Sequence, residues 1–322
     1  MKYYIAADGG GTKLLTVLYD ENYRILRTVK TAGTNNAFKP IEQIREETEA
    51  MVEELFEGEI GSTVHEIASA DSSIVGPSDI LLDAVSRHAP ILEKHHYGEG
   101  HVALGATGKR YGCVAQAGTG SDAFLIQPGY METCGGWGAL LGDEGSGYDI
   151  GLRTLKAAIY AEDGRGPGTE ILPILLEKWK LGCLYEIIDR CISDPDYRKL
   201  VASASYVTEL AADMGDPVAI GIFEQAGREL GLQVRTVLRK CKGEFQGPVV
   251  ASGGAWKGSG VMFRAMRDDV HSEYPEAYVT YPIFEPLVGS VILRAMNEGE
   301  SFEAIEPVLR KEFSGYLYPR KA

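Results

Sequence analysis

Two glycine-rich turns, each enclosed by apolar β-forming segments, constrain the fold of this chain more than any other feature. The first turn spans residues 8–12, between strand-like segments at 3–7 and 14–19. The second spans residues 118–121, between similar segments at 111–117 and 123–126. Runs rich in β-formers and bounded by glycine predict strands, so each turn is expected to join one strand to the next. The repeated arrangement indicates an internal duplication.

This strand-to-strand setting excludes two familiar nucleotide-binding loops. A Rossmann loop and a P-loop both lead from a strand into a helix, and the P-loop also needs a Gly-Lys-Ser/Thr ending that the chain lacks. A glycine turn between strands can still bind phosphate through its backbone N–H groups, although a plain hairpin turn has the same composition. Asp8 could hold Mg²⁺ through water, or it could simply favour the turn.

The rest of the chain alternates between helical and strand-like patterns, which predicts an α/β protein. A length of 322 residues suits two lobes, and no low-complexity linker separates them. We expect an N-terminal lobe at 1–117, joined by the C-terminal helix at about 287–322, and a second lobe at 118–286. The predicted elements beyond the turns are helices at 41–56, 80–88, 222–240 and 287–296, the last with Pro286 at its first position, and strands at 23–29, 66–70 and 248–251.

Charge and composition exclude several classes of partner. The formal net charge is −14, from 46 acidic and 32 basic residues, so the average surface repels nucleic acid and anionic lipid. No apolar run approaches the length of a membrane span and no signal peptide is indicated, so we expect a cytoplasmic protein. The five cysteines are scattered without a Cys-x-x-Cys spacing, which predicts reduced, mostly buried thiols and no zinc site.

Five motifs, taken in order, carry a resemblance to a known family. They are Asp8-Gly9-Gly10-Gly11-Thr12-Lys13, Gly118-Thr119-Gly120-Ser121, Cys134-Gly135-Gly136-Trp137-Gly138, Leu141-Gly142-Asp143-Glu144-Gly145-Ser146 and Ser252-Gly253-Gly254. Across residues 3–296 the chain resembles the N-acetylglucosamine kinases, a branch of the BadF/BadG/BcrA/BcrD-type ATPases in the actin-like, hexokinase-like superfamily. The resemblance implies two ribonuclease-H-like lobes with mixed sheets, and an active site for ATP, Mg²⁺ and sugar in the cleft between the lobes.

The resemblance also implies a role for each motif. ATP phosphates would contact Gly10, Gly11, Thr12 and Lys13 in one turn and Gly118, Thr119, Gly120 and Ser121 in the other, and adenosine would contact Ser252, Gly253 and Gly254. The sugar would contact Asn35, Gly136, Trp137 and Asp143. A tryptophan face and hydrogen-bonding side chains suit a pyranose. Trp137 could instead be a core residue, and Asp143 or Glu144 could instead cap the helix expected near Ser146.

Phosphoryl transfer to a hydroxyl also needs a carboxylate base beside the acceptor. An ungapped count from Gly118 places Glu99 where the resembling family has an aspartate. Its base chemistry is the same with one more methylene, and Gly98 and Gly100 could let the backbone compensate. His101 is a second candidate base. His95 and its neighbour His96 have the pattern of a solvated pair without metal-ligand neighbours.

The function implied is ATP-dependent phosphorylation of an amino sugar, N-acetylglucosamine or a related hexosamine, by direct in-line transfer. Two alternatives remain open. One is an ATPase that activates a dehydratase-type enzyme, for which Cys113 and Cys134 would be the nearest ligands of a shared iron–sulfur cluster. The other is a sugar or nucleotide sensor without catalytic activity. The identity of the sugar and the formation of a homodimer stay undecided at this stage.

Overall fold

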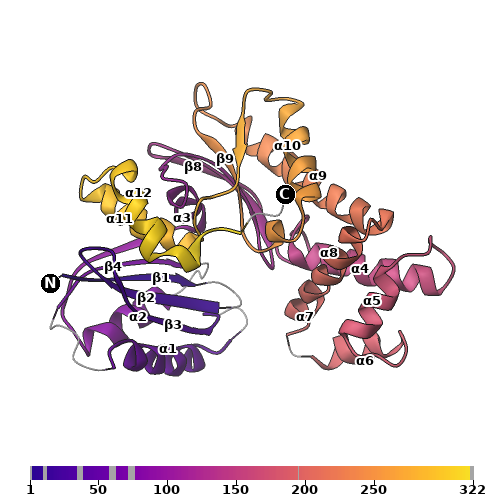
Figure 1. Ribbon diagram of the computed structural model, residues 1–322, viewed down its shortest axis with the longest axis horizontal. Helices are drawn as coiled ribbons and strands as arrows, with labels where there is room; N and C mark the ends of the chain where they lie inside the picture. Colours follow the sequence, from indigo (N-terminus) through magenta and orange to yellow (C-terminus); the bar gives the residue numbers. More distant parts are fainter. Residues whose placement is uncertain are drawn as a thin grey trace. The chain divides into compact units, whose positions relative to one another are not determined.

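The computed structural model of the protein (Figure 1) describes residues 2–9, 13–34, 39–57, 63–71, 77–194 and 196–319. The chain forms two units. The first unit comprises residues 1–110 and 282–318, and the second comprises residues 111–281 and 319–322.

The first unit is built on a five-stranded mixed sheet. Its strands are β1 (Tyr3–Gly9), β2 (Lys13–Asp20), β3 (Ile25–Ala32), β4 (Val64–Asp71) and β5 (Ile91–Tyr97), in the order β3-β2-β1-β4-β5. The first three strands form an antiparallel meander, whereas β4 and β5 run parallel to β1. The prediction that the first glycine turn joins two strands is therefore confirmed.

Helices cover both faces of this sheet, because side chains alternate between the faces along β1. Ile5 and Ala7 belong to a core with the first two helices, and Tyr4 and Ala6 belong to a core with the C-terminal helices. Figure 1 shows the C-terminal helices, drawn in yellow, beside the indigo strands that begin the chain. The helices are α1 (Ile41–Leu55) and α2 (Pro77–Ser86) on one face, and α3 (Glu99–Gly105), α11 (Pro286–Asn297), α12 (Phe302–Glu312) and the short η2 (Ser314–Tyr316) on the other.

The second unit repeats the topology of the first. Its strands are β6 (Gly112–Ala117), β7 (Ser121–Gln127), β8 (Tyr130–Gly135), β9 (Pro248–Ser252) and β10 (Tyr278–Thr280), in the order β10-β9-β6-β7-β8. Again three strands form an antiparallel meander, and two later strands add in parallel. The internal duplication inferred from the two turns is thus confirmed by strand order and direction.

The division between the units differs from the expected lobe boundaries at both ends. Strand β6 lies at the centre of the second sheet, hydrogen-bonded to β7 and β9, so residues 111–117 belong to the second unit. Residues 282–286 belong to the first unit, because the amides of Ile283 and Phe284 donate to the carbonyl of Ala106 and Phe284 is fully buried there. Non-local pairing decides both boundaries, and no local signal in the sequence marks them.

Helices make up most of the remainder of the second unit. The long helix α9 (Pro217–Leu238) packs on the sheet, and α10 (Gly260–His271) packs on α9. Asp216 and Pro217 define the start of α9 as N-cap and first helical residue. The other elements are α4 (Gly147–Glu162), α5 (Ile171–Lys178), α6 (Glu186–Ser193), α7 (Tyr197–Ser203), α8 (Ser205–Asp213) and the short η1 (Ala255–Lys257).

Two further sequence expectations can be compared with the fold. All five cysteines are free, but only Cys113 is fully buried and Cys183 is exposed, so the expectation of mostly buried thiols is too strong. Among the described helices, none is long and apolar enough to cross a membrane.

Candidate functional site

The second glycine turn is a short connection from β6 to β7 that is held from two sides. Within the turn, the amide of Gly118 donates to the carbonyl of Gly120 at 2.8 Å. At its end, the Ser121 hydroxyl donates to the carbonyl of Glu144 at 2.8 Å. Both contacts limit the freedom of the turn, and the second ties it to the loop that precedes α4.

The N-terminus of α4 lies directly against this turn. The amide of Gly147 donates to the carbonyl of Gly118 at 2.8 Å, and the amide of Tyr148 donates to the carbonyl of Thr119 at 3.3 Å. In the part of the chain that the structure describes, the amides of Thr119 and Gly120 donate no hydrogen bond. The carbonyls of Gly118 and Thr119 therefore accept hydrogen bonds from α4. The amides of Thr119 and Gly120 are available to an anion, as in phosphate-binding turns.

Asp143 is buried beside the same turn. Its carboxylate accepts a long hydrogen bond from the amide of Ser121, at 3.4 Å, and a Cβ placed on Gly120 would lie 3.0 Å from it. Its backbone has a φ of 60°, a left-handed conformation that Asp tolerates better than most residues. Burial raises the pKa of Asp143, although the Ser121 and Gly138 amides and the charge of Arg198 act in the opposite direction.

The capping alternative for Asp143 and Glu144 is wrong. The N-cap of α4 is Ser146, whose side chain accepts from the amide of Asp149 at 3.1 Å. Asp149 in turn accepts from the amide of Gly145 at 3.0 Å. The helix start is therefore satisfied without Asp143 or Glu144.

Trp137 lies on the surface of the second unit, with 75% of its area exposed. The alternative that Trp137 is a core residue is therefore wrong. Gly136 before it has a φ of 73°, and a Cβ placed on Gly142, the residue before Asp143, would lie 3.1 Å from the Cβ of Trp137. An exposed indole on a loop anchored beside a buried carboxylate could cover the apolar face of a sugar ring.

The third glycine motif lies at the same edge of the sheet as the phosphate turn. Strands β6 and β9 are parallel neighbours, with Gln116 opposite Ser252, so both end there. Gly253 has a φ of 112°, and any Cβ at this position would lie 2.4 Å from the carbonyl oxygen of Ala117. Only glycine lets the loop approach the turn this closely. Carboxyl ends of parallel strands are a common ligand-binding edge of α/β sheets.

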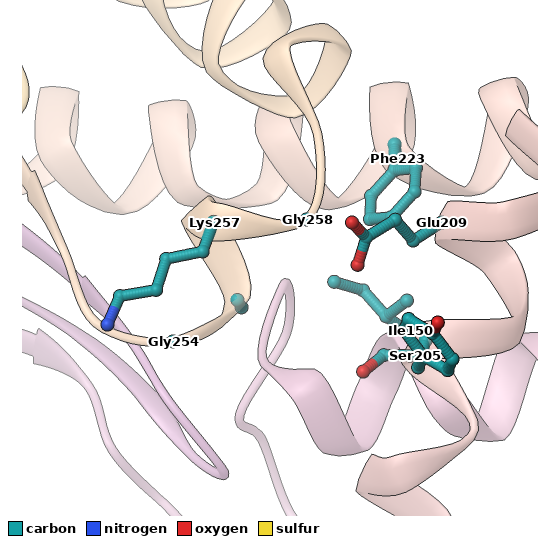
Figure 2. Close-up of a pocket in the computed structure, with 9 residues that line it drawn as sticks. Ile150, Ser205, Glu209, Phe223, Gly254, Lys257 and Gly258 are labelled. Atoms are coloured by element: carbon teal, nitrogen blue, oxygen red, sulfur yellow. The ribbon is translucent and has the colours of Figure 1, made fainter. Parts of the chain in front are cut away.

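A hollow of about 200 Å³ opens beside Gly254. Figure 2 shows the carboxylate of Glu209 pointing into the space near Gly258 and Ile150, whereas the side chain of Lys257 extends in another direction. The hollow is lined by Ile150, Ser205, Tyr206, Glu209, Phe223, Gly254, Ala255, Lys257 and Gly258. No motif in the sequence marks the side chains from α8, since that helix meets Gly254 only through folding. The residues of η1 directly follow Gly254 in the chain.

The first unit holds the remaining candidates that the structure describes. Asp8 is half-buried near the end of β1, and Glu99 is half-buried as the first residue of α3, directly after β5. Strands β1, β4 and β5 are parallel neighbours, with Asp8 opposite Ala70 and Ala70 opposite Tyr97. Two strand spacings separate β1 from β5, so Asp8 and the start of α3 share one edge about 10 Å apart.

Of the candidates for phosphate or sugar contact in the first unit, the structure describes only Lys13. Lys13 is exposed at the start of β2. Gly10, Gly11, Thr12 and Asn35, predicted to contact phosphate and sugar, lie outside the described residues. Their roles stay predictions.

His101 and His95 of the first unit differ in their surroundings. Burial lowers the pKa of His101, so its ring is neutral near pH 7, and its Nδ1 atom is buried without a hydrogen-bond partner among the described residues.

His95 does have metal-ligand neighbours, since its Nε2 atom lies 3.8 Å from Glu66 and 4.0 Å from Glu93. The expectation that His95 lacks such neighbours is wrong, because the register of β4 and β5 brings Glu66 across.

The cysteines bear on the dehydratase-activator alternative. Cys113 is fully buried in β6, and burial raises the pKa of its thiol. A cluster shared between subunits needs accessible thiolates, so Cys113 is a poor ligand for one. Of the two cysteines named for this alternative, only Cys134 is partly exposed.

Curated relatives match nearly the whole chain. An N-acetylmuramic acid/N-acetylglucosamine kinase from Clostridium acetobutylicum is 28% identical over 301 residues, which covers 91% of this chain and 98% of the relative. An N-acetyl-D-glucosamine kinase from Dictyostelium discoideum is 29% identical over 317 residues, with the same two coverages of 91% and 98%. Each of these proteins is named for phosphorylating an N-acetylated amino sugar.

Solved structures show the fold, and a family model shows the family. A glucokinase of the ROK family from Streptomyces griseus, solved with glucose and AMPPNP, has a TM-score of 0.60 at 18% identity, covering 90% of this chain and 98% of that one. A Porphyromonas gingivalis protein with a provisional N-acetylglucosamine kinase name has a TM-score of 0.71 at 17% identity, covering 93% and 100%. The expected fold of actin-like ATPases is thereby confirmed. Because the model of the BadF/BadG/BcrA/BcrD ATPase family matches residues 7–293, this chain belongs to that family.

Proposed function

We propose that this protein transfers the γ-phosphate of ATP to a hydroxyl of an amino sugar, N-acetylglucosamine or a related hexosamine. The observation that carries the proposal is the convergence within the second unit of three motifs: the turn at 118–121, buried Asp143, and the loop at 252–254 beside the hollow. The curated relatives, matched over 91% of this chain, support the class of substrate.

The second unit would bind the nucleotide and part of the sugar. The amides of Thr119 and Gly120 would donate to ATP phosphates, and adenosine would occupy the hollow next to Gly254. Trp137 would cover the apolar face of the sugar, while Asp143 would accept hydrogen bonds from its hydroxyls. A sugar that lacks such a hydroxyl would leave this buried carboxylate unsatisfied, which provides specificity.

The first unit would provide the base and the site for the metal ion. Glu99 would accept the proton of the attacking hydroxyl during direct in-line transfer. Mg²⁺ would be held by Asp8 through water, since a half-buried carboxylate at the end of β1 offers the oxygen ligand that this ion prefers. When bound, Mg²⁺ neutralises charge on the phosphates. The proposal includes a cytoplasmic location.

A coupled assay of ADP release tests the proposal. The purified chain would be screened with ATP and Mg²⁺ against glucosamine, N-acetylglucosamine, N-acetylmuramic acid and N-acetylmannosamine. We expect turnover with at least one of them. Failure to release ADP with every amino sugar, despite measurable sugar binding, would instead support the sensor alternative.

Substitutions at Glu99 test the role of the base. Glu99→Gln keeps the size of the side chain but cannot accept the proton, so kcat should fall by roughly 10²- to 10⁴-fold. Glu99→Asp keeps the chemistry and should retain part of the activity. Full activity in Glu99→Gln together with a large loss in His101→Ala would transfer the role to His101.

A further inference from the structure

Three side chains with metal-binding atoms lie together on one face of the first sheet. Glu66 is on β4, and Glu93 and His95 are on the neighbouring edge strand β5. The parallel register sets Glu66 opposite Glu93 and Ala68 opposite His95. Because side chains two residues apart point to the same face, one ligand atom from each residue lies within 4.8 Å of the others.

Glu66 is the unusual member of this group. Its side chain is 1% exposed, and its Oε1 atom, 3.8 Å from His95, has no hydrogen-bond partner among the described residues. Burial raises the pKa of Glu66, although His95 and Arg294 favour its charged form. A buried carboxylate oxygen without a partner is costly, and a bound cation would remove that cost.

We propose that Glu66, Glu93 and His95 bind a divalent transition-metal cation of the Zn²⁺ type. One imidazole nitrogen and two carboxylate oxygens suit such ions, whereas Mg²⁺ and Ca²⁺ prefer oxygen ligands alone. Three protein ligands leave a fourth position for water, which is accessible because Glu93 and His95 are 59% and 40% exposed.

Small side-chain movements would complete the site. Metal–ligand bonds of about 2.0–2.2 Å set tetrahedral ligands roughly 3.4 Å apart, so the present separations, none above 4.8 Å, need to shorten by at most about 1.4 Å. Glu93 and His95 can make this adjustment because they are partly exposed on an edge strand. The bound ion would then cross-link β5 to β4 and hold the edge strand in the sheet.

This site is separate from the proposed nucleotide-binding edge. Glu66 lies opposite Tyr4 on β1, four residues before Asp8. At about 3.3 Å per residue, that places the cluster roughly 13 Å from Asp8 along the strands. Binding at the cluster is therefore testable without reference to kinase activity.

The test is Zn²⁺ binding by the full-length chain, measured by competition with a chromophoric chelator. The variants are His95→Gln and Glu93→Gln, which alter partly exposed residues and should leave the fold intact, and Glu66→Gln. His96→Gln is the matched control, because His96 lies on the same strand but points to the opposite face. Thermal unfolding with and without Zn²⁺ provides a second measurement.

We expect the parent and His96→Gln to bind one Zn²⁺ per chain at this site and to gain thermal stability from it. His95→Gln, Glu93→Gln and Glu66→Gln should each bind at least about tenfold more weakly and lose that gain. Equal Zn²⁺ affinity in the parent and His95→Gln would overturn the proposal. So would an equal loss in His96→Gln, because binding would then depend on a side chain of the opposite face of the sheet.

Discussion

The substitution Gly289→Ala tests how closely α11 approaches α3, the helix that begins at Glu99. A Cβ added to Gly289 would lie 1.9 Å from the carbonyl oxygen of Val102, whereas ordinary contact begins at 3.4 Å. The helices would therefore have to separate by about 1.5 Å, because the obstruction is backbone and cannot rotate away. The same carbonyl accepts the amide of Ala106, so the last turn of α3 would be strained as well.

Both stability and turnover should respond. Overpacking against backbone costs about 3 kcal/mol, and the better helix propensity of Ala returns about 1 kcal/mol, so urea unfolding should show a net loss of about 2 kcal/mol. Glu99 is three residues before Val102 in a helix of seven residues. A displacement of about 1 Å at a catalytic base can lower kcat roughly a hundredfold.

A matched control separates the steric effect from the chemistry of the change. Gly221 lies inside α9 with no atom within 4 Å of its added Cβ, so Gly221→Ala should be neutral or stabilising by up to about 1 kcal/mol. If Gly289→Ala proves as stable as Gly221→Ala, the close approach of α3 and α11 is refuted. If stability falls while kcat stays at the parent value, α3 does not position the base.

Two further predictions concern the second unit. Gly253→Ala should raise the KM for ATP at least about tenfold with little effect on the KM for sugar, because the new Cβ would displace the loop from Ala117. Steady-state kinetics, with Gly221→Ala as the control, checks this. An unchanged KM for ATP would count against the assignment of adenosine to this loop. Asp216 caps α9 and also accepts from the amide of Glu170 at 2.7 Å. Desolvation opposes its ionisation, but the hydrogen bonds from Ala219, Glu170 and Thr169 outweigh it and lower its pKa. The stability that this carboxylate contributes is therefore present above an unfolded pKa of about 3.9 and lost as pH falls through the folded pKa. Asp216→Ala should cost about 1–2 kcal/mol at pH 7 and much less near pH 2, as measured by unfolding at both values; a cost independent of pH would contradict this.

Local patterns predicted the repeated parts of the fold. The turns at 8–12 and 118–121 lie between apolar alternating segments, so strand–turn–strand connections could be inferred from residue order alone. The helical spacing in 41–56 and 222–240 likewise predicted α1 and α9 within a few residues. These signals are local, since each depends on residues that are close in the sequence.

Other features depended on strand register and on packing between distant segments. The position of Asp143 against Gly120 depends on how the loop of residues 136–146 packs on the turn at 118–121. The exposure of Trp137 depends on the packing of the same loop. The helices of residues 171–213 and the edge strand β5 were not predicted from the spacing of apolar residues.

The sequence by itself determined the glycine turns, the duplication, and an acidic composition that argues against nucleic acid as a partner. Only the tertiary structure decided which side chains meet. Glu66 and His95 are 29 positions apart in the chain, and a one-residue slip of β5 would turn His95 to the opposite face. Glu209 reaches the hollow beside Gly254 only because α8 and the loop after β9 fold together. Long-range contacts of this kind are set by the free energy of the whole core, which no short stretch of residues encodes.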